Sequence, residues 1–266
     1  MSGLLDGRVV IVTGAARGIG QAYSLALARH GASVAVADLL DPSETVSQIN
    51  ALRQGSAVGI EVDVANFATC QAMVKKTIDA FGTVTGLINN AALFGVSAKQ
   101  KGVQLRPFTE ISEEDWDQTM AINVKGTWNC CKAVVPHMME KGYGKIVNIS
   151  SQTIGMGTPM ILDYVTSKGA VATMARCLAR ELGPHGIRVN ALTPGFTQSQ
   201  AVKDLVGTLG AMGSGMTQQY AAQAALGRPQ VPEDMVGTAV YLMSELSDFV
   251  TGQLLNVDGG QSHTGM

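Results

Sequence analysis

The sequence has little charge and few aromatic side chains. Of its 266 residues, 15% are Asp, Glu, Lys or Arg, and 5% are Phe, Trp or Tyr. The 19 basic and 21 acidic residues nearly cancel and are mixed along the chain, so neither nucleic acid nor an anionic membrane is expected as a partner. Because 46% of the residues are hydrophobic, a mainly disordered chain is also excluded. The composition therefore predicts a folded protein with a large core.

Cysteine and histidine are also rare. The four cysteines are Cys70, Cys130, Cys131 and Cys177. They form no CxxC pair and are too few for a disulfide framework, so a reducing cytoplasmic location is expected. The 4 histidines are scattered without ligand spacing, which argues against a catalytic metal. No apolar run reaches the roughly 18 residues of a membrane-spanning helix, and residues 1–8 do not resemble a signal peptide.

What the sequence does contain is a regular alternation of short apolar runs and helical patterns. Strands are predicted at 8–13, 33–38, 57–62, 86–89, 145–149, 187–192 and 254–257. Helices are predicted at 18–30, 43–53, 66–81, 112–139, 163–182 and 233–244. Alternating strands and helices form βαβ units, which give a parallel sheet with helices on both faces. Residues 1–266 are therefore predicted to be a single α/β domain with a Rossmann-type, doubly wound, mostly parallel sheet of about seven strands.

The long helix predicted at 112–139 carries a stripe of large apolar residues. Trp116, Met120, Val124 and Trp128 recur every four residues, which is the spacing of one helix face. We therefore expect these four side chains to form the buried face of that helix.

Residues 196–228 do not fit the alternation, because they are rich in Gly, Ala, Met and Gln and only weakly helical. Long segments of this kind in a compact domain are usually lids or binding loops. We expect this segment to cover the substrate and to be mobile without it. The apolar side chains that could close such a lid are Leu205, Leu209, Met212 and Met216. A rigid pair of helices packed on the core is the alternative.

A glycine-rich turn directly follows the first predicted strand. Its residues are Thr13, Gly14, Ala15, Ala16, Arg17, Gly18, Ile19 and Gly20. Glycines at this spacing let backbone N–H groups approach a pyrophosphate, and the helix that begins there adds the positive end of its dipole. An ordinary tight turn is the alternative, but three glycines between a strand and a helix favour a dinucleotide site.

Asp38 ends the second predicted strand, 18 residues after Gly20. A carboxylate at this point can accept hydrogen bonds from the adenosine ribose and would repel a 2′-phosphate, which favours NAD over NADP. Arg17 argues weakly for NADP, since a basic residue in this turn can reach such a phosphate. No basic residue follows Asp38, because Leu39 and Leu40 come next. The alternative is that Asp38 only caps a turn.

Tyr164 and Lys168 lie four residues apart on a predicted helix and so share one face. An ammonium group near a phenol stabilises the phenolate, which yields an acid/base able to exchange a proton with an alcohol oxygen. This pair alone is a weak signal. Here it follows Ser151 by 13 residues, and Ser151 comes just after the carboxyl end of a predicted strand. Ligands bind at that edge of doubly wound sheets, where the serine hydroxyl could hold a substrate oxygen.

These motifs together resemble the short-chain dehydrogenase/reductase family over nearly the whole chain. The family's TGxxxGxG pattern is met by residues 13–20, and its NNAG pattern by residues 89–92, with Ala92 in place of the usual glycine. The residues that match the family's catalytic set are Asn123, Ser151, Tyr164 and Lys168. Pro194 and Gly195 match the family's Pro-Gly after the sixth strand, and residues 256–260 resemble its last strand.

The resemblance implies roles for these residues. Tyr164 is expected to be the acid/base, Lys168 to lower its pKa and bind the nicotinamide ribose, and Ser151 to orient the substrate oxygen. Asn123 is expected to hold a water that links Lys168 to solvent. The cofactor contacts expected from the motifs and the resemblance are Gly14, Arg17, Gly18, Ile19, Gly20, Asp38, Asp63, Val64, Asn89, Ala91, Tyr164, Lys168, Pro194, Gly195 and Thr197. Whether Thr197 or Ser199 meets the carboxamide is open.

The substrate is expected to be small and apolar or aromatic. Residues 196–226 carry one basic residue, Lys203, whereas phosphorylated, CoA-linked or carrier-linked substrates favour more positive charge. The chain resembles bacterial NAD-dependent secondary-alcohol dehydrogenases, which implies hydride transfer between NAD and an alcohol or ketone in a homotetramer. One alternative is a 3-oxoacyl reductase that uses NADP. Another is a non-catalytic nucleotide-sensing protein, against which the intact catalytic set argues.

Overall fold

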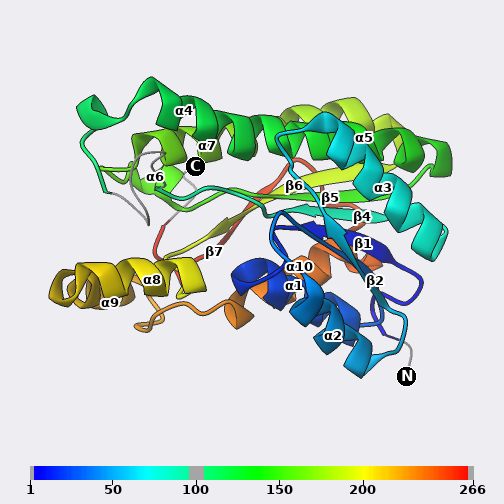
Figure 1. The fold of residues 1–266 in the computed structure, drawn as a ribbon, viewed down its shortest axis with the longest axis horizontal. Coiled ribbons are helices and arrows are strands. Elements are labelled where there is room, and N and C mark those ends of the chain that lie inside the picture. The colour runs from blue at the N-terminus through cyan, green and yellow to red at the C-terminus, as the bar shows by residue number, and fades with distance from the viewer. Residues whose placement is uncertain (1–2, 96–104, 263–266) are drawn as a thin grey trace.

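The chain folds around a seven-stranded parallel sheet, seen edge-on among its helices in Figure 1. The computed structural model describes residues 3–95 and 105–262. The strands are β1 (Val9–Thr13), β2 (Ser33–Asp38), β3 (Ala57–Glu61), β4 (Gly86–Asn89), β5 (Gly144–Ile149), β6 (Ile187–Pro194) and β7 (Leu254–Val257). Their order is β3-β2-β1-β4-β5-β6-β7, and every neighbouring pair is parallel. The predicted Rossmann-type fold and strand count are confirmed.

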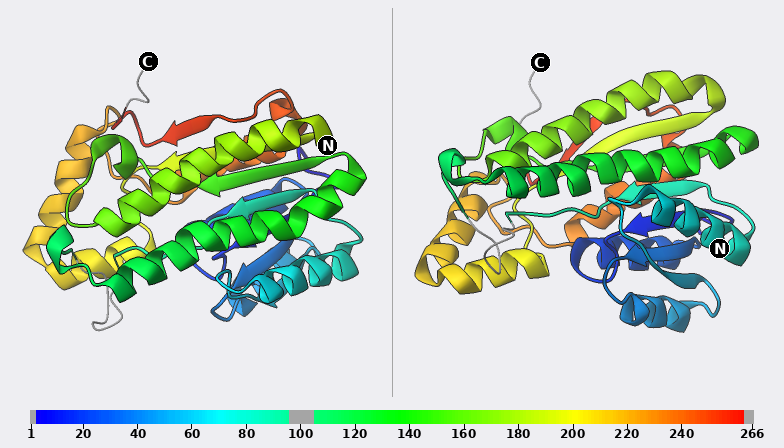
Figure 2. Two further views of the ribbon diagram at one scale, coloured as in Figure 1. Left: turned by 90° about the horizontal axis from the view of Figure 1, so that it is seen from above. Right: turned by 45° about the horizontal axis from the view of Figure 1, so that its top comes forward.

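Helices cover both faces of the sheet, with α1, α2 and α10 on one side and α3, α5 and α7 on the other (Figures 1 and 2). The α-helices are α1 (Gly18–Arg29), α2 (Ser43–Leu52), α3 (Phe67–Phe81), α4 (Glu113–Thr119), α5 (Thr127–Lys141), α6 (Thr153–Met156), α7 (Leu162–Leu182), α8 (Gln200–Leu209), α9 (Ala211–Gln223) and α10 (Glu233–Met243). The predicted element ends agree with these within two residues. None of the helices in the described ranges is both long and apolar enough to cross a bilayer.

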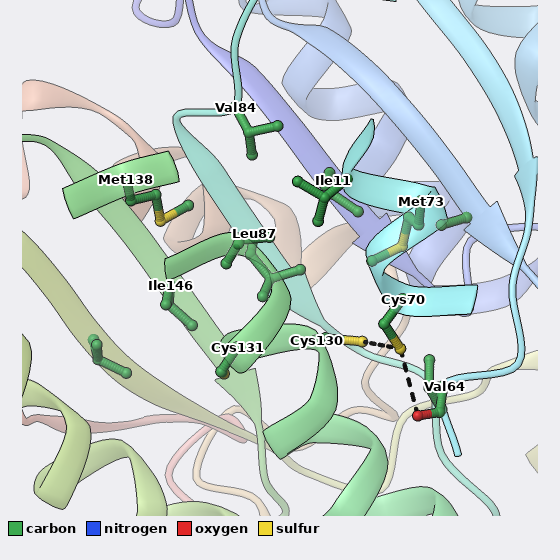
Figure 3. Packing of buried hydrophobic residues seen from close by; sticks show 14 of the residues in the cluster. Ile11, Val64, Cys70, Met73, Val84, Leu87, Cys130, Cys131, Met138 and Ile146 are labelled. Atoms are coloured by element: carbon green, nitrogen blue, oxygen red, sulfur yellow. Dashed lines mark hydrogen bonds between the residues drawn. The ribbon is translucent and has the colours of Figure 1, made fainter. Parts of the chain in front are cut away.

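Two apolar cores lie on the two faces of the sheet, because successive strand residues point to opposite sides. Ile11 packs toward α3 and α5, while Val10 and Val12 pack toward α1 and α10. Cys70 and Cys130 lie in the first core with their Sγ atoms 3.8 Å apart (Figure 3). They are free thiols that fill space between α3 and α5.

The predicted helix at 112–139 is interrupted by a π-helical turn, η2 (Met120–Gly126), which joins α4 to α5. The prediction of which face of this helix is buried is wrong. The residues turned inward are Asp115, Thr119, Asn123 and Thr127, whereas Trp128 is 43% exposed.

Hydrogen bonds to neighbouring elements explain this inversion, because buried polar groups need partners. Thr119 Oγ1 donates to Asp163 Oδ2 on α7 over 2.9 Å. The Asn123 side chain likewise bonds to Ser167 on that helix. The polar face of the long helix is thus turned inward by partners that lie on α7. In the apolar stripe Trp128 is exposed, while Trp116, Met120 and Val124 are partly buried.

Within residues 196–228 the chain forms a helical hairpin, α8 followed by α9. Gly210 joins the two helices with a φ of 57°, a backbone conformation that favours glycine. Gly213 lets the helices approach closely, because a Cβ there would lie 2.5 Å from Val206 O. The hairpin extends beyond the carboxyl ends of the strands (Figure 1).

Candidate active site

A cavity of about 500 Å³ lies where β5 and β6 end, between the glycine-rich turn, the start of α7 and the α8–α9 hairpin. The predicted residues that line it are Ile19, Ser151, Tyr164, Lys168, Pro194, Gly195 and Thr197. Asn90, Ala92 and Phe94, which the sequence analysis did not select, also line it. Asn90 and Ala92 belong to the matched 89–92 motif, so they could have been predicted from it. No motif in the sequence includes Phe94.

The glycine-rich turn is held tightly against the end of β4. Asn90 Nδ2 donates to the carbonyl oxygens of Thr13 and Gly14 over 3.1 and 3.0 Å. A Cβ on Gly20 would lie 2.1 Å from Gly14 O, and one on Gly14 would lie 2.8 Å from Ala91 Cα. Only glycine fits these two positions.

The helix that follows this turn begins without a side-chain cap, since Arg17 at its N-cap accepts no hydrogen bond. Its first N–H groups and the positive end of its dipole are therefore left to an anion. The close-packed glycines and the uncapped helix start fit the pyrophosphate of a dinucleotide.

Asp38 lies beside the glycine-rich turn. Its Oδ2 accepts a hydrogen bond from Ala16 N at 2.8 Å, and its Oδ1 accepts one from Leu40 N at 2.9 Å. The carboxylate therefore caps the turn, as in the alternative interpretation. Each oxygen keeps a second acceptor site, so the same side chain can also meet a ribose hydroxyl.

Four other predicted cofactor residues, Asp63, Val64, Asn89 and Ala91, do not line the cavity. Asp63 is exposed after β3, while Val64 is buried and lies against Gly126 of η2. The Asn89 side chain faces the core, where its Nδ2 donates to Asn148 Oδ1 over 2.9 Å and to Cys131 Sγ over 3.2 Å.

The catalytic candidates Ser151, Tyr164 and Lys168 meet at the cavity wall. Lys168 Nζ is buried and donates to Ile149 O at the end of β5 over 2.7 Å. It lies 5.7 Å from the centre of the Tyr164 ring. Phe94 packs edge-on against the same ring, with the ring centres 4.9 Å apart. The helix spacing of four residues thus brings ammonium and phenol to one wall, as predicted.

Burial shifts both titrating groups of this pair away from their charged forms. It raises the pKa of Tyr164 to about 12, while a hydrogen bond from Ser151 acts in the lowering direction. It lowers the pKa of Lys168 to about 8. The raised tyrosine pKa is opposite to the shift expected from the lysine alone, so Tyr164 keeps its proton at neutral pH.

Asn123 is buried in η2 and does not line the cavity. Its Oδ1 accepts from Leu93 N at 2.7 Å, and its Nδ2 donates to Leu93 O at 2.9 Å and to Ser167 Oγ at 3.0 Å. These bonds join the loop after β4 to α7, one residue before Lys168. Its backbone carbonyl accepts from Thr127 Oγ1 at 2.8 Å. The Asn123 side chain therefore links the loop after β4 to α7.

The outer half of the cavity is apolar and aromatic. Phe196 and Tyr220 stack with their ring centres 4.4 Å apart, and so tie the start of the hairpin segment to α9. Met160 has a φ of 69°, which is unusual for a residue with a side chain. The other apolar residues of this half include Leu105, Met156, Ile161, Val202, Leu205 and Met216. Of the predicted lid residues, Leu209 lies outside the lining, and the Met212 side chain is not among those described.

Both hydroxyls proposed for the carboxamide line the cavity. Ser199 Oγ accepts from Val202 N at 3.4 Å and so caps α8. Thr197 Oγ1 donates to Gly195 O at 3.2 Å.

A family model described as enoyl-(acyl carrier protein) reductase matches residues 14–262. An uncharacterized oxidoreductase of Mycobacterium tuberculosis is 38% identical over 97% of this chain and 98% of its own length. The chain belongs to the short-chain dehydrogenase/reductase family. It is also 37% identical to the 2,5-dichloro-2,5-cyclohexadiene-1,4-diol dehydrogenase of Sphingobium indicum, over 96% of this chain and 97% of that enzyme.

A solved structure supports the same family. A Sinorhizobium meliloti protein assigned as a short-chain alcohol dehydrogenase superposes with a TM-score of 0.86 at 30% identity, and the match covers 97% of each chain. The protein is therefore an oxidoreductase of this family, whose dehydrogenases use nicotinamide cofactors.

Proposed function

We propose that this protein transfers a hydride between NAD and a secondary alcohol or its ketone. The observation that carries the proposal is the convergence of Ser151, Tyr164 and Lys168 on one cavity wall, beside the turn that begins α1. The nicotinamide supplies the hydride chemistry when bound, and the protein supplies position and proton transfer.

Each catalytic side chain has its own proposed role. Ser151 holds the substrate oxygen next to Tyr164. In ketone reduction the Tyr164 hydroxyl donates its proton to that oxygen, and in alcohol oxidation the phenolate takes the proton back. The Lys168 ammonium favours the phenolate and binds the nicotinamide ribose. Asn123 holds α7 against the loop after β4 through bonds to Ser167 and Leu93, and a water on it would connect Lys168 to solvent.

NAD is the proposed cofactor because the Asp38 carboxylate lies next to Ala16 of the glycine-rich turn. A 2′-phosphate at this point would face a carboxylate in a poorly hydrated site, where like charges repel strongly. Gly14, Arg17, Gly18, Ile19 and Gly20 form the phosphate side of the proposed site.

The other proposed cofactor contacts are more distant from the cavity or come from its far wall. Asp63 and Val64 are proposed to flank the adenine. The Asn89 side chain points away from the cavity and bonds to Asn148, so Asn89 is proposed to contact the cofactor through its backbone. Ala91 is proposed to do the same. Pro194, Gly195 and Thr197 form the wall proposed for the carboxamide side.

The proposed substrate is a small apolar or aromatic secondary alcohol. Among the described residues that line the cavity, Lys168 is the one charged side chain, and it belongs to the catalytic wall. The Sphingobium relative carries the name of a cyclic diol dehydrogenase, and a cyclic alcohol suits this lining. A carrier-linked 3-oxoacyl group would lack a cation here for its phosphate, which makes the 3-oxoacyl reductase the weaker candidate.

A homotetramer and a cytoplasmic location complete the proposal. Outward-facing Trp128 and Met139, 43% and 39% exposed, support burial against another copy. The unpaired cysteines suit a reducing compartment.

The decisive test is a panel of secondary alcohols and ketones with NAD(H) and NADP(H), followed at the nicotinamide absorbance. We expect turnover of an aromatic secondary alcohol with NAD+. Absence of turnover with every pair would favour the nucleotide-sensing alternative, and efficient turnover of 3-oxoacyl thioesters with NADPH would favour the reductase.

A further inference from the structure

Gln152, the residue after Ser151, combines burial with an unused hydrogen-bond acceptor. The residue is 2% exposed and lines the cavity. No donor in residues 3–95 or 105–262 pairs with its Oε1 atom. A buried amide oxygen without a partner is unfavourable, and native structures retain few of them. Such an atom beside a proposed catalytic serine suggests a partner that arrives with the substrate.

The backbone explains how two consecutive residues face one cavity. Neighbouring side chains of a strand point to opposite faces. Here the chain has left β5 at Ile149, and Gln152 has helical angles, φ −64° and ψ −18°, at the start of α6. Gln152 N donates to Pro194 O over 3.0 Å, which ties this turn to the end of β6. The backbone therefore holds Gln152 in the wall of the cavity.

The charge of the site restricts what that ligand group can be. Among the described lining residues the one charged side chain is Lys168, whose ammonium would repel a cationic donor. Phe94, Phe196 and Leu205 make the surrounding wall apolar. A neutral hydroxyl on an apolar frame suits both the acceptor and its surroundings.

We propose that Gln152 is a specificity-determining residue that accepts a hydrogen bond from a second hydroxyl of the substrate. This inference rests on the proposed function, because it assumes that Ser151 holds the reacting oxygen. The Cα atoms of consecutive residues lie about 3.8 Å apart, so the second hydroxyl belongs on the carbon next to the reacting carbinol or one further along. The substrate class is then a vicinal or 1,3-diol on an apolar frame, with the matching hydroxyketone in the reverse direction.

The test compares two alcohols that differ by one hydroxyl, 1-phenylethane-1,2-diol and 1-phenylethanol. We expect the wild-type kcat/KM with NAD+ to be higher for the diol on the order of 10- to 100-fold, because the alcohol without the hydroxyl leaves Oε1 unpaired. Gln152→Leu should bring this ratio close to one by lowering kcat/KM for the diol. Gln218→Leu, an exposed residue of α9 outside the cavity lining, is the matched control and should keep the wild-type ratio.

The thermal stability of the variants shows whether Gln152 recognises the substrate or only supports the fold. Removing a buried acceptor that has no internal partner should leave the Tm of Gln152→Leu equal to or above that of the wild type. Gln152→Met, with a similar length, serves if the leucine variant does not fold. A ratio near one in the wild type, or a diol preference that survives both substitutions, would overturn the inference.

Binding measurements distinguish a failure of the proposed function from a failure of the Gln152 inference. If these two alcohols and the rest of the panel are not turned over with NAD+ or NADP+, the proposed function fails. Calorimetric titration of both compounds into the NAD-saturated protein then tests Gln152 directly. Tighter binding of the diol that is lost in Gln152→Leu would support the inference, and equal binding would contradict it.

Discussion

Tyr164 works in surroundings that raise the pKa of its hydroxyl. Burial raises this pKa to about 12, whereas the hydrogen bond of Ser151 acts in the lowering direction. Tyr164 therefore keeps its proton at neutral pH, which under the proposed function suits ketone reduction. For alcohol oxidation it must first lose its proton.

Tyr164→Phe should abolish turnover and leave NAD binding nearly intact. The substitution keeps the ring that packs on Phe94 and removes the hydroxyl. General acid/base groups contribute about 10²–10⁴-fold, so kcat should fall at least that far. Steady-state kinetics and calorimetric NAD titration measure the two effects. Tyr143→Phe, whose ring stacks with Arg8 and Arg188 away from the cavity, is the control; high activity in Tyr164→Phe would mean that another group moves the proton.

The pH profile should differ between the two directions. Below a pKa of about 12 the phenolate fraction of Tyr164 rises with pH. We therefore expect kcat/KM for alcohol oxidation to increase from pH 7 to pH 10, while ketone reduction does not increase. Oxidation rates that are flat over this range would show that deprotonation of Tyr164 does not limit the step.

Asp38 should decide cofactor preference. Asp38→Ala combined with Leu39→Arg removes the repulsion of a 2′-phosphate and adds a cation, so the ratio of kcat/KM for NADP+ to that for NAD+ should rise by at least 10-fold. Loss of the Asp38 bond to Ala16 N would also loosen the turn, so Tm is recorded for each variant. Better catalytic efficiency of the unmodified enzyme with NADP+ than with NAD+ would contradict the NAD proposal and point to Arg17.

At the scale of elements, the α8–α9 hairpin covers one side of the cavity. Its contacts to the rest of the molecule include the stacking of Tyr220 on Phe196 and a hydrogen bond from Gln261 Nε2 to Tyr220 O. Leu205 is buried, while Met216 lines the cavity at the helix that follows. The apolar side that the hairpin turns toward the cavity suits an element that closes on the substrate.

Hydrogen exchange should detect this closure. Amide protection over residues 200–223 should rise when NAD and a substrate analogue are added together, because the closed hairpin would exclude water. Met216→Ala should change substrate preference more than NAD affinity, whereas Met139→Ala on α5 should change neither. Equal, high protection with and without ligands would establish a rigid helix pair instead.

At the scale of the whole molecule, the long helix α4–η2–α5 carries exposed apolar side chains near both of its ends. Trp128 is 43% exposed on this face, and its ring contacts Lys132. Phe108, Trp116 and Leu162 line a shallow groove at the other end of the helix. Exposed apolar side chains at these two places support the proposed association with other copies.

Light scattering should give a mass about four times the chain mass of 27.8 kDa. Trp128→Glu should shift the protein toward smaller species, because a carboxylate in an apolar interface is costly. Leu52→Glu, at an exposed position that ends α2, should leave the mass unchanged. A monomer mass for the unmodified protein at micromolar concentration would contradict the tetramer.

Local sequence patterns determined the strands, most of the helices and the parallel direction of the sheet. Apolar runs and glycine turns act over a few residues, so the element ends at Gly18 or Asp38 could be predicted closely. The four-residue spacing of Tyr164 and Lys168 likewise implies one helix face in any fold. The parallel topology also predicted that the motif residues after the strands would lie close together, because parallel strands end at the same edge of the sheet.

Only the tertiary structure decided which side of the long helix is buried and which side chains remain without partners. Asn123 and Thr119 face inward because Ser167 and Asp163, more than 40 positions away, supply their hydrogen bonds. The unpaired Oε1 of Gln152 and the burial that raises the pKa of Tyr164 also depend on residues that are distant in the sequence. Hydrogen bonding and desolvation depend on atoms brought together by folding, and spacing along one chain does not reveal them.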